Sequence, residues 1–227
     1  MRMFTATVVA ATAGSAFAGL STTDPGLFTD IDDRFEARIR LDAGNSQTWK
    51  SAIWDDTTLL GTSGNVQNLF TNGAANPFSF SYDAVTGDAS LTVAGRTVTE
   101  TISLTPGSGI AGFRFFVRGE ANAATTTVAN LMASVDGAAA ESVPGLATTL
   151  STGFVESPNY YVDSLSVASL ALTGDVTFDW LGTATQNNLK NERLKFSFKV
   201  LEGTPIPSPA GVAMLAFGGL VALRRRR

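Results

Sequence analysis

Between residues 30 and 200, apolar side chains recur at every second position rather than at every third or fourth. The segment RFEARIRL at 34–41 is the clearest case, because its apolar residues alternate strictly with charged ones. The same period occurs at 78–82, 91–93, 113–117, 176–180 and 194–200. A period of two turns one face of each segment inward, so each segment is predicted to be a half-buried β-strand.

Further strands are predicted near 47–54, 97–104, 124–135 and 165–172, separated by turn signals rich in Gly, Pro, Asn and Asp. The segment 137–153 has few strand signals and is predicted to be a long loop or a short helix. About ten strands without a clear amphipathic helix predict an all-β fold. The expected architecture is an antiparallel two-sheet sandwich, jelly-roll-like, in one domain over residues 19–204.

The 227 residues contain no Cys and no His, which narrows the possible chemistry. Disulfides, thiolate nucleophiles, Ser-His-Asp triads and zinc sites built from Cys or His are excluded. No cofactor is expected, and any bound metal would be a hard cation held by oxygen, with calcium the leading candidate. Of the 16 Lys and Arg, Arg2 and Arg224 to Arg227 lie in the termini, whereas all 20 acidic residues lie in 19–206, whose net charge is therefore −9. Such a body is not expected to bind nucleic acid.

The first 18 residues have the pattern of a signal peptide. A short basic start precedes a small apolar run that ends in Ala16-Phe17-Ala18. Small residues at positions −3 and −1 predict cleavage by signal peptidase between Ala18 and Gly19. The alternative is an ordinary apolar N-terminus.

The C-terminal segment 205–227 has three parts. Pro207-Ser208-Pro209 comes first, followed by an apolar run from Ala210 to Leu223 and by four arginines, Arg224, Arg225, Arg226 and Arg227. As a helix the apolar run would extend about 21 Å, less than the roughly 30 Å of a hydrocarbon core. The basic end would stay on the cytoplasmic side. We therefore expect a transient inner-membrane anchor, with a permanent C-terminal anchor as the alternative.

This tail resembles the PEP-CTERM sorting signals of Gram-negative bacteria that make exopolysaccharide. Those signals combine a Pro-x-Pro motif, a hydrophobic helix with small residues and a basic end, and Ser208 stands where the namesake motif has Glu. The resemblance implies that an exosortase, a membrane-embedded Cys transpeptidase, recognises and removes the tail. The chain would then be inner-membrane anchored before processing, and would reach the cell surface or extracellular matrix after it.

The segments NPFSFSYDAVTGDASLTVAGRTVTETISL, at 76–104, and 165–200 are similar to the choice-of-anchor domains, with the W type as the candidate. That resemblance implies a secreted surface domain without an established activity, and it supplies no catalytic residues. The expected function is a non-enzymatic surface or matrix protein associated with exopolysaccharide. The alternative is a carbohydrate-binding module, and a carboxylate-based glycoside hydrolase is less favoured.

A glycoside hydrolase of the jelly-roll type needs two carboxylates on one face of a strand, about 5 Å apart. No E-x-D-x-E or E-x-D-x-x-E arrangement occurs in the chain. Glu100 shares the parity of Val98 and Ile102, so its carboxylate is expected to face inward. It could serve as an acid or base, or it could have a structural role at an edge, at a bulge or beside Arg114. No catalytic residue is assigned.

Three further groups are candidate binding residues. Asp30, Asp32 and Asp33 precede the first clear strand and could hold calcium, with solvated loop acids as the alternative. Tyr160 and Tyr161 could stack on sugars, as could Trp49 and Trp54, with core packing as the alternative. Arg34, Arg38 and Arg40 point outward from the first strand, and Lys195 and Lys199 from the last. If those strands are neighbours, the cations would suit an anionic polysaccharide unless Glu36, Glu192 and other acids neutralise them.

Overall fold

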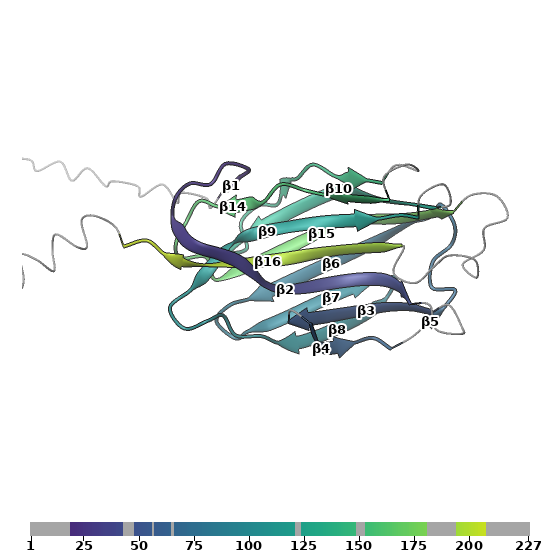
Figure 1. Cartoon of the computed structure of the whole chain (residues 1–227), viewed down its shortest axis with the longest axis horizontal. Coiled ribbons are helices and arrows are strands. Elements are labelled where there is room, and N and C mark those ends of the chain that lie inside the picture. Colours follow the sequence, from purple (N-terminus) through teal and green to yellow (C-terminus); the bar gives the residue numbers. More distant parts are fainter. Residues whose placement is uncertain are drawn as a thin grey trace, which may run out of the picture.

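The structure, a computed structural model, describes residues 19–42, 48–55, 57–64, 66–120, 124–148, 153–180 and 194–207. In these residues two antiparallel sheets pack face to face and there is no helix (Figure 1). The predicted all-β sandwich is therefore confirmed. The chain crosses from one sheet to the other between β9 (Gly109–Arg118) and β10 (Ala124–Val135), and again between β15 (Ser169–Trp180) and β16 (Lys195–Pro205).

The first sheet, sheet A, contains the N-terminal and C-terminal strands of the domain. Its spatial order is β1 (Leu20–Ser21), β14 (Tyr160–Val162), β9 (Gly109–Arg118), β16 (Lys195–Pro205), β2 (Phe28–Asp42), β3 (Thr48–Asp55) and β4 (Thr58–Thr62). Two short strands pair beside this path, β13 (Phe154–Glu156) with β9 and β5 (Val66–Gln67) with β3.

The second sheet, sheet B, contains most of the central part of the chain. Its spatial order is β11 (Glu141–Ser142), β10 (Ala124–Val135), β15 (Ser169–Trp180), β6 (Ala75–Asp83), β7 (Asp88–Val93) and β8 (Arg96–Thr101), and β12 (Leu146–Ala147) also pairs with β10. Strands β8 and β4 form the edges of the two sheets on the same side of the sandwich (Figure 1).

The described residues form sixteen strands rather than about ten. Six of them have only two or three residues (β1, β5, β11, β12, β13 and β14), too short to show a period of two. The segments 165–172 and 176–180, predicted as separate strands, belong to one strand, β15, which begins at Ser169 and continues through Gly174, paired with Phe78. The described part of 137–153 is mostly loop, which was one of the two predicted alternatives, and it includes two two-residue strands, β11 and β12, and no helix.

Aromatic side chains join the two sheets in the core. Phe80 of β6 meets Phe198 of β16 with ring centroids 4.3 Å apart, and Phe78 meets Phe196 at 4.7 Å. Each such buried ring contributes about 1.5–3 kcal/mol through the hydrophobic effect. Tyr82 also points inward, where its hydroxyl donates to the Ile102 carbonyl at 2.8 Å. Burial raises the pKa of Tyr82 to about 12.

Gly112 of β9 permits a close approach between β9 and β14. Its φ is 154°, and a Cβ at this position would lie 2.0 Å from the Tyr160 carbonyl oxygen. Tyr161 pairs directly with Gly112, so the backbone contact occupies the space that a side chain would need. Any other residue at 112 is expected to push β14 away from the sheet.

Strands β1 and β2 begin, and β16 ends, at the same end of the sandwich (Figure 1). The Ile206 amide donates to the Leu27 carbonyl at 2.9 Å, and Pro205 pairs with Phe28. We call this the terminal end, and the opposite end, where β16 begins at Lys195, the far end. The part of the chain that the structure describes contains no helix long and apolar enough to cross a membrane. The predicted anchor at 210–223 lies outside that part.

Candidate functional site

The outer face of sheet A carries most of the cations singled out from the sequence. Strands β2 and β16 are direct neighbours, with Lys195 opposite Arg40, Ser197 opposite Arg38, and Lys199 opposite Glu36. The register therefore places four of the five cations on one face. Arg34 instead turns toward the edge, where its Nη1 lies 2.7 Å from Asp55 Oδ1 and its Nε donates to the Ser103 carbonyl at 3.0 Å.

Acidic side chains on the same face contact these cations. Lys195 Nζ lies 2.7 Å from Glu36 Oε1, and Arg38 Nη1 lies 3.8 Å from Glu36 Oε2. Lys199 pairs with Asp33. These contacts reduce the positive charge available to a polyanion. They match the alternative raised from the sequence, in which nearby acidic residues neutralise the cations. Glu192, the other acid named in that alternative, lies outside the described residues.

Asp33 is the centre of a charge network near the terminal end of this face. Arg114 donates to both of its carboxylate oxygens, from Nε at 3.0 Å and from Nη2 at 2.7 Å, and Lys199 donates as well. Burial works to raise the pKa of the Asp33 carboxyl, but the hydrogen bonds from the two cations outweigh it and lower that pKa below its ordinary value. Arg114 Nη1 also lies 3.0 Å from Glu156 Oε1.

This network bears on the calcium site expected at Asp30, Asp32 and Asp33. A calcium ion at Asp33 would have to displace Arg114 and Lys199, which already compensate its charge. Asp30 and Asp32 are exposed, and Asp32 Oδ1 accepts the Asp33 amide at 2.7 Å. Within the described residues no three acidic side chains are grouped so that they could hold a metal ion.

The aromatic candidates for sugar stacking are mostly covered. Tyr160 is 4% exposed and stacks on Phe113, with ring centroids 5.1 Å apart, so the structure places it in the core rather than on the surface. Trp49 is also buried in the core. Tyr161 is half-buried and its hydroxyl accepts from Asn159 Nδ2 at 3.1 Å. The ring of Trp54 lies under the Arg38 guanidinium, 3.7 Å from its centroid.

Two cations that the sequence analysis did not single out complete a row across sheet A. Lys50 of β3 pairs with Arg40, Arg40 with Lys195, and Lys195 with Arg118 of β9. Like charges directly opposite one another destabilise a sheet. Part of the compensation comes from aromatic rings, because Lys195 Nζ lies 4.4 Å from the centroid of the Phe116 ring. Only the cross-strand register shows this row, since its members come from four separate strands.

Glu100 faces inward, as its parity indicated, and lies on the edge strand β8 opposite Ala89. A Cβ on Gly61 of β4 would lie 1.9 Å from Glu100 Oε1, so the carboxylate occupies the space that this glycine leaves. Arg114, the partner considered for Glu100, pairs with Asp33 and Glu156 instead. An inward charge on an edge strand discourages pairing with another chain, which gives Glu100 a structural role.

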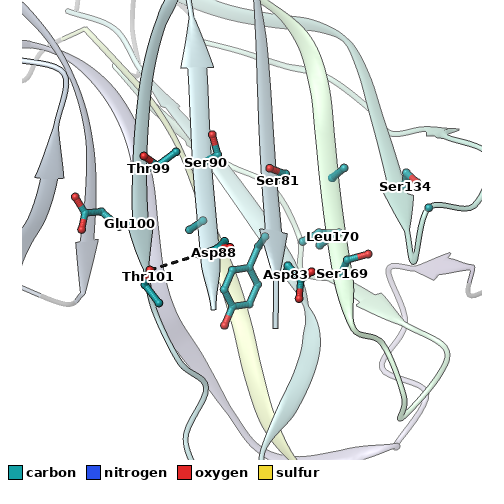
Figure 2. Close-up of a pocket in the computed structure, with 14 residues that line it drawn as sticks. Ser81, Asp83, Asp88, Ser90, Thr99, Glu100, Thr101, Ser134, Ser169 and Leu170 are labelled. Carbon is teal, nitrogen blue, oxygen red and sulfur yellow. Dashed lines mark hydrogen bonds between the residues drawn. The ribbon is translucent and has the colours of Figure 1, made fainter. Parts of the chain in front are cut away.

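The outer face of sheet B contains a hollow of about 590 Å³ that crosses five strands (Figure 2). Its floor is a row of small side chains in register. Thr99 of β8 is opposite Ser90 of β7, Ser90 opposite Ser81 of β6, Ser81 opposite Ala171 of β15, and Ala171 opposite Ser134 of β10. The sequence signal for this hollow was the use of Ser and Thr, rather than Lys or Glu, at outward positions.

The polar groups of the hollow are hydroxyls and carboxylates. The hydroxyls of Ser81, Ser90 and Thr99 make no side-chain hydrogen bond within the described residues. The end of the hollow nearer the terminal end carries Asp83 and Asp88, with Ser169 beside them (Figure 2). None of the residues that line it is Lys or Arg. The hollow can therefore bind a ligand that donates hydrogen bonds, and it disfavours an anion.

The chain ends fall largely outside the described residues. Gly19 and Pro207 are described, whereas Ala18, Ser208, Pro209 and Arg224 to Arg227 are not. No protein-family model matches the sequence, and no curated protein matches it either.

Proposed function

We propose that this chain is an exported, exosortase-sorted, non-enzymatic protein of the cell surface or extracellular matrix that associates with exopolysaccharide. Signal peptidase and exosortase are its processing partners, and the inner membrane holds it only before the tail is removed. The signal-peptide pattern at 1–18 and the three-part tail at 205–227 support export and sorting.

The observation that carries this proposal is the placement of the two chain ends. Gly19 directly follows the predicted signal peptide, and Pro207 begins the Pro-x-Pro motif of the predicted tail. The neighbouring strands β1 and β16 begin and end, respectively, at the terminal end of the sandwich (Figure 1). A domain tethered from that end would present both outer faces and the far end to its surroundings. The strand β16, with 11 residues at about 3.3 Å each, would hold Lys195 roughly 35 Å from the tether point.

A carbohydrate-binding module is the second candidate function, and the hollow on sheet B favours it. A hydrolase is less favoured, because the carboxylate of Glu100 points away from the hollow and occupies the space beside Gly61 (Figure 2). Glu100 is also the only acidic residue of β8, so the strand offers no carboxylate pair of the kind that retaining glycosidases use.

The sorting proposal is tested with the full chain expressed in an exosortase-containing host. A variant with Pro207→Ala and Pro209→Ala is compared with wild type by separating inner-membrane, surface and medium fractions. Wild type is expected mainly in the surface and medium fractions, and the variant in the inner membrane, because the processing motif has been removed.

The matched control is Pro25→Ala, which changes an exposed proline outside the tail and should distribute like wild type. The proposal is wrong if wild type remains in the inner membrane, or if the double variant is released as efficiently as wild type. Deleting the exosortase from the host should reproduce the effect of the double variant.

A further inference from the structure

The hollow on sheet B combines a cavity large enough for a small molecule with a row of hydroxyls and, at one end, two carboxylates. Its volume of about 590 Å³ lies within the range of small-molecule sites. The hydroxyls of Ser81, Ser90 and Thr99 stand on neighbouring strands, which are spaced about 4.8 Å apart. Such a row could exchange hydrogen bonds with the hydroxyls of a sugar, and the half-buried methyl of Ala171, which lines the hollow, offers an apolar contact for the ring.

No Lys or Arg lines the hollow to offset the negative charge of its carboxylates. The strands of sheet B contain one cation, Arg96, which does not line the hollow. They contain six acidic residues: Asp83, Asp88, Glu100, Glu141, Asp175 and Asp179. In contrast, every other Lys and Arg among the described residues lies in sheet A.

Asp83 and Asp88 place negative charge at one end of the hydroxyl row. They flank the paired residues Tyr82 and Ala89, and their parity is that of Ser81 and Ser90, so both side chains belong to the outer face. Asp83 Oδ1 accepts the amides of Val85 and Thr86 at 2.8 and 3.1 Å, and its Oδ2 has no hydrogen-bond partner in the described part of the chain. Asp88 Oδ1 accepts only the Thr101 hydroxyl, at 3.4 Å.

We infer that this hollow binds a hydroxylated ammonium ligand, namely an amino sugar whose amine is free, as a unit of a polysaccharide. The ammonium would contact Asp83 and Asp88, and the sugar hydroxyls would exchange hydrogen bonds with Ser81, Ser90 and Thr99. Charge-assisted hydrogen bonds to a carboxylate are about twice as strong as neutral ones, so the amine would supply the selectivity. This inference rests on the proposed association with exopolysaccharide and specifies the polymer. The polymer would carry free amines, whereas the sequence led us to expect an anionic polysaccharide.

The test is calorimetric titration of the full chain in a buffer free of amines. The probes are short oligomers of glucosamine, the same oligomers after N-acetylation, neutral glucose oligomers, and spermidine, which has ammonium groups but no hydroxyls. Glucosamine oligomers are expected to bind saturably, and the other three probes at least about tenfold more weakly, since each lacks one of the two recognised features.

Three variants locate the binding. Asp83→Asn and Asp88→Asn should each weaken glucosamine binding by about tenfold. Both should keep the fold, because Asp88 is exposed and the amide oxygen of Asp83→Asn can still accept from the Val85 and Thr86 amides. Asp179→Asn removes the same charge from an exposed position of the same sheet outside the hollow, and should bind like wild type.

Several results would overturn the inference. These are equal binding of the acetylated or neutral oligomers, binding of spermidine as tight as that of glucosamine oligomers, or wild-type affinity in both Asn variants. Failure of binding in a chain whose tail is still processed and released would reject the ligand and leave the proposed sorting intact. Failure of sorting would not change the titration.

Discussion

Asp33 shows how one carboxylate organises neighbouring strands. It accepts hydrogen bonds from Arg114 of β9 and Lys199 of β16 while lying on β2, so it links three strands on the outer face of sheet A. Replacement by Asn would remove the charged partner of Lys199 and would leave Arg114 paired with Glu156 alone. We expect Asp33→Asn to lower the free energy of unfolding at pH 7 by roughly 2 kcal/mol, as measured by urea denaturation.

The effect of Asp33→Asn should depend on pH in a defined direction. Because folding lowers the pKa of Asp33 from 3.8, its ionised form stabilises the fold above about pH 3.8, and that stability is lost as the pH falls through the folded-state pKa. The difference between wild type and variant should thus be full at pH 7 and shrink below pH 3.8. A difference that stays constant into this acidic range would contradict the assignment. Asp30→Asn, at an exposed position with φ of 52°, should change stability by less than about 0.5 kcal/mol.

At the scale of single residues, parity along a strand could be predicted from the sequence, but cross-strand partners could not. The period of two correctly predicted that Glu100 faces inward and Arg38 faces outward. It could not show that Arg38 lies over Trp54, that Lys199 meets Asp33, or that Tyr160 stacks on Phe113 inside the core. Those contacts depend on which strands are neighbours and in what register, information that no single segment contains.

Strand β8 is the edge strand of sheet B on the same side of the sandwich as β4. Glu100 is its only acidic residue and lies on the same side as Val98, with its carboxylate beside Gly61 of β4. Glu100→Val would remove this carboxylate and leave an edge of high β-propensity whose one remaining charge is Arg96 at its first position. We expect the variant to stay folded and to associate through β8, giving a mass by light scattering that rises with concentration above that of wild type.

The control for this prediction is Thr97→Val, which adds an apolar group to the outer face of the same strand and leaves Glu100 in place. It should match wild type in mass at every concentration. If Glu100→Val also keeps the wild-type mass throughout, the protective role of this carboxylate is refuted.

Elements with long alternating patterns were predictable, and short ones were not. The predicted segment 124–135 coincides with β10, because a strand of 12 residues is long enough for the alternation of apolar and polar side chains to be recognised. Strands of two or three residues, such as β1 and β12, arise where a loop passes beside an existing sheet edge and have no pattern of their own. The hollow was missed for a related reason, since its floor takes one residue from each of five strands.

At the scale of the whole molecule, the sandwich has two chemically different faces and two different ends. Sheet A carries an ion-paired surface with a row of cations near the far end, whereas the strands of sheet B carry acids and hydroxyls with a single cation. Strand β1 begins and strand β16 ends at the other end, and in the sequence the predicted signal peptide and sorting tail adjoin these strands (Figure 1). This arrangement suits a domain that is held from one end while a face of sheet B meets a polymer.

The most direct test of this account is the intact mass of the protein recovered from the surface and medium of an exosortase-containing host. The account predicts a polypeptide that begins at Gly19 and lacks the apolar run from Ala210 onward, alone or joined to a new C-terminal group. A recovered chain that retains residues 1–18, or that still carries Arg224 to Arg227, would contradict it.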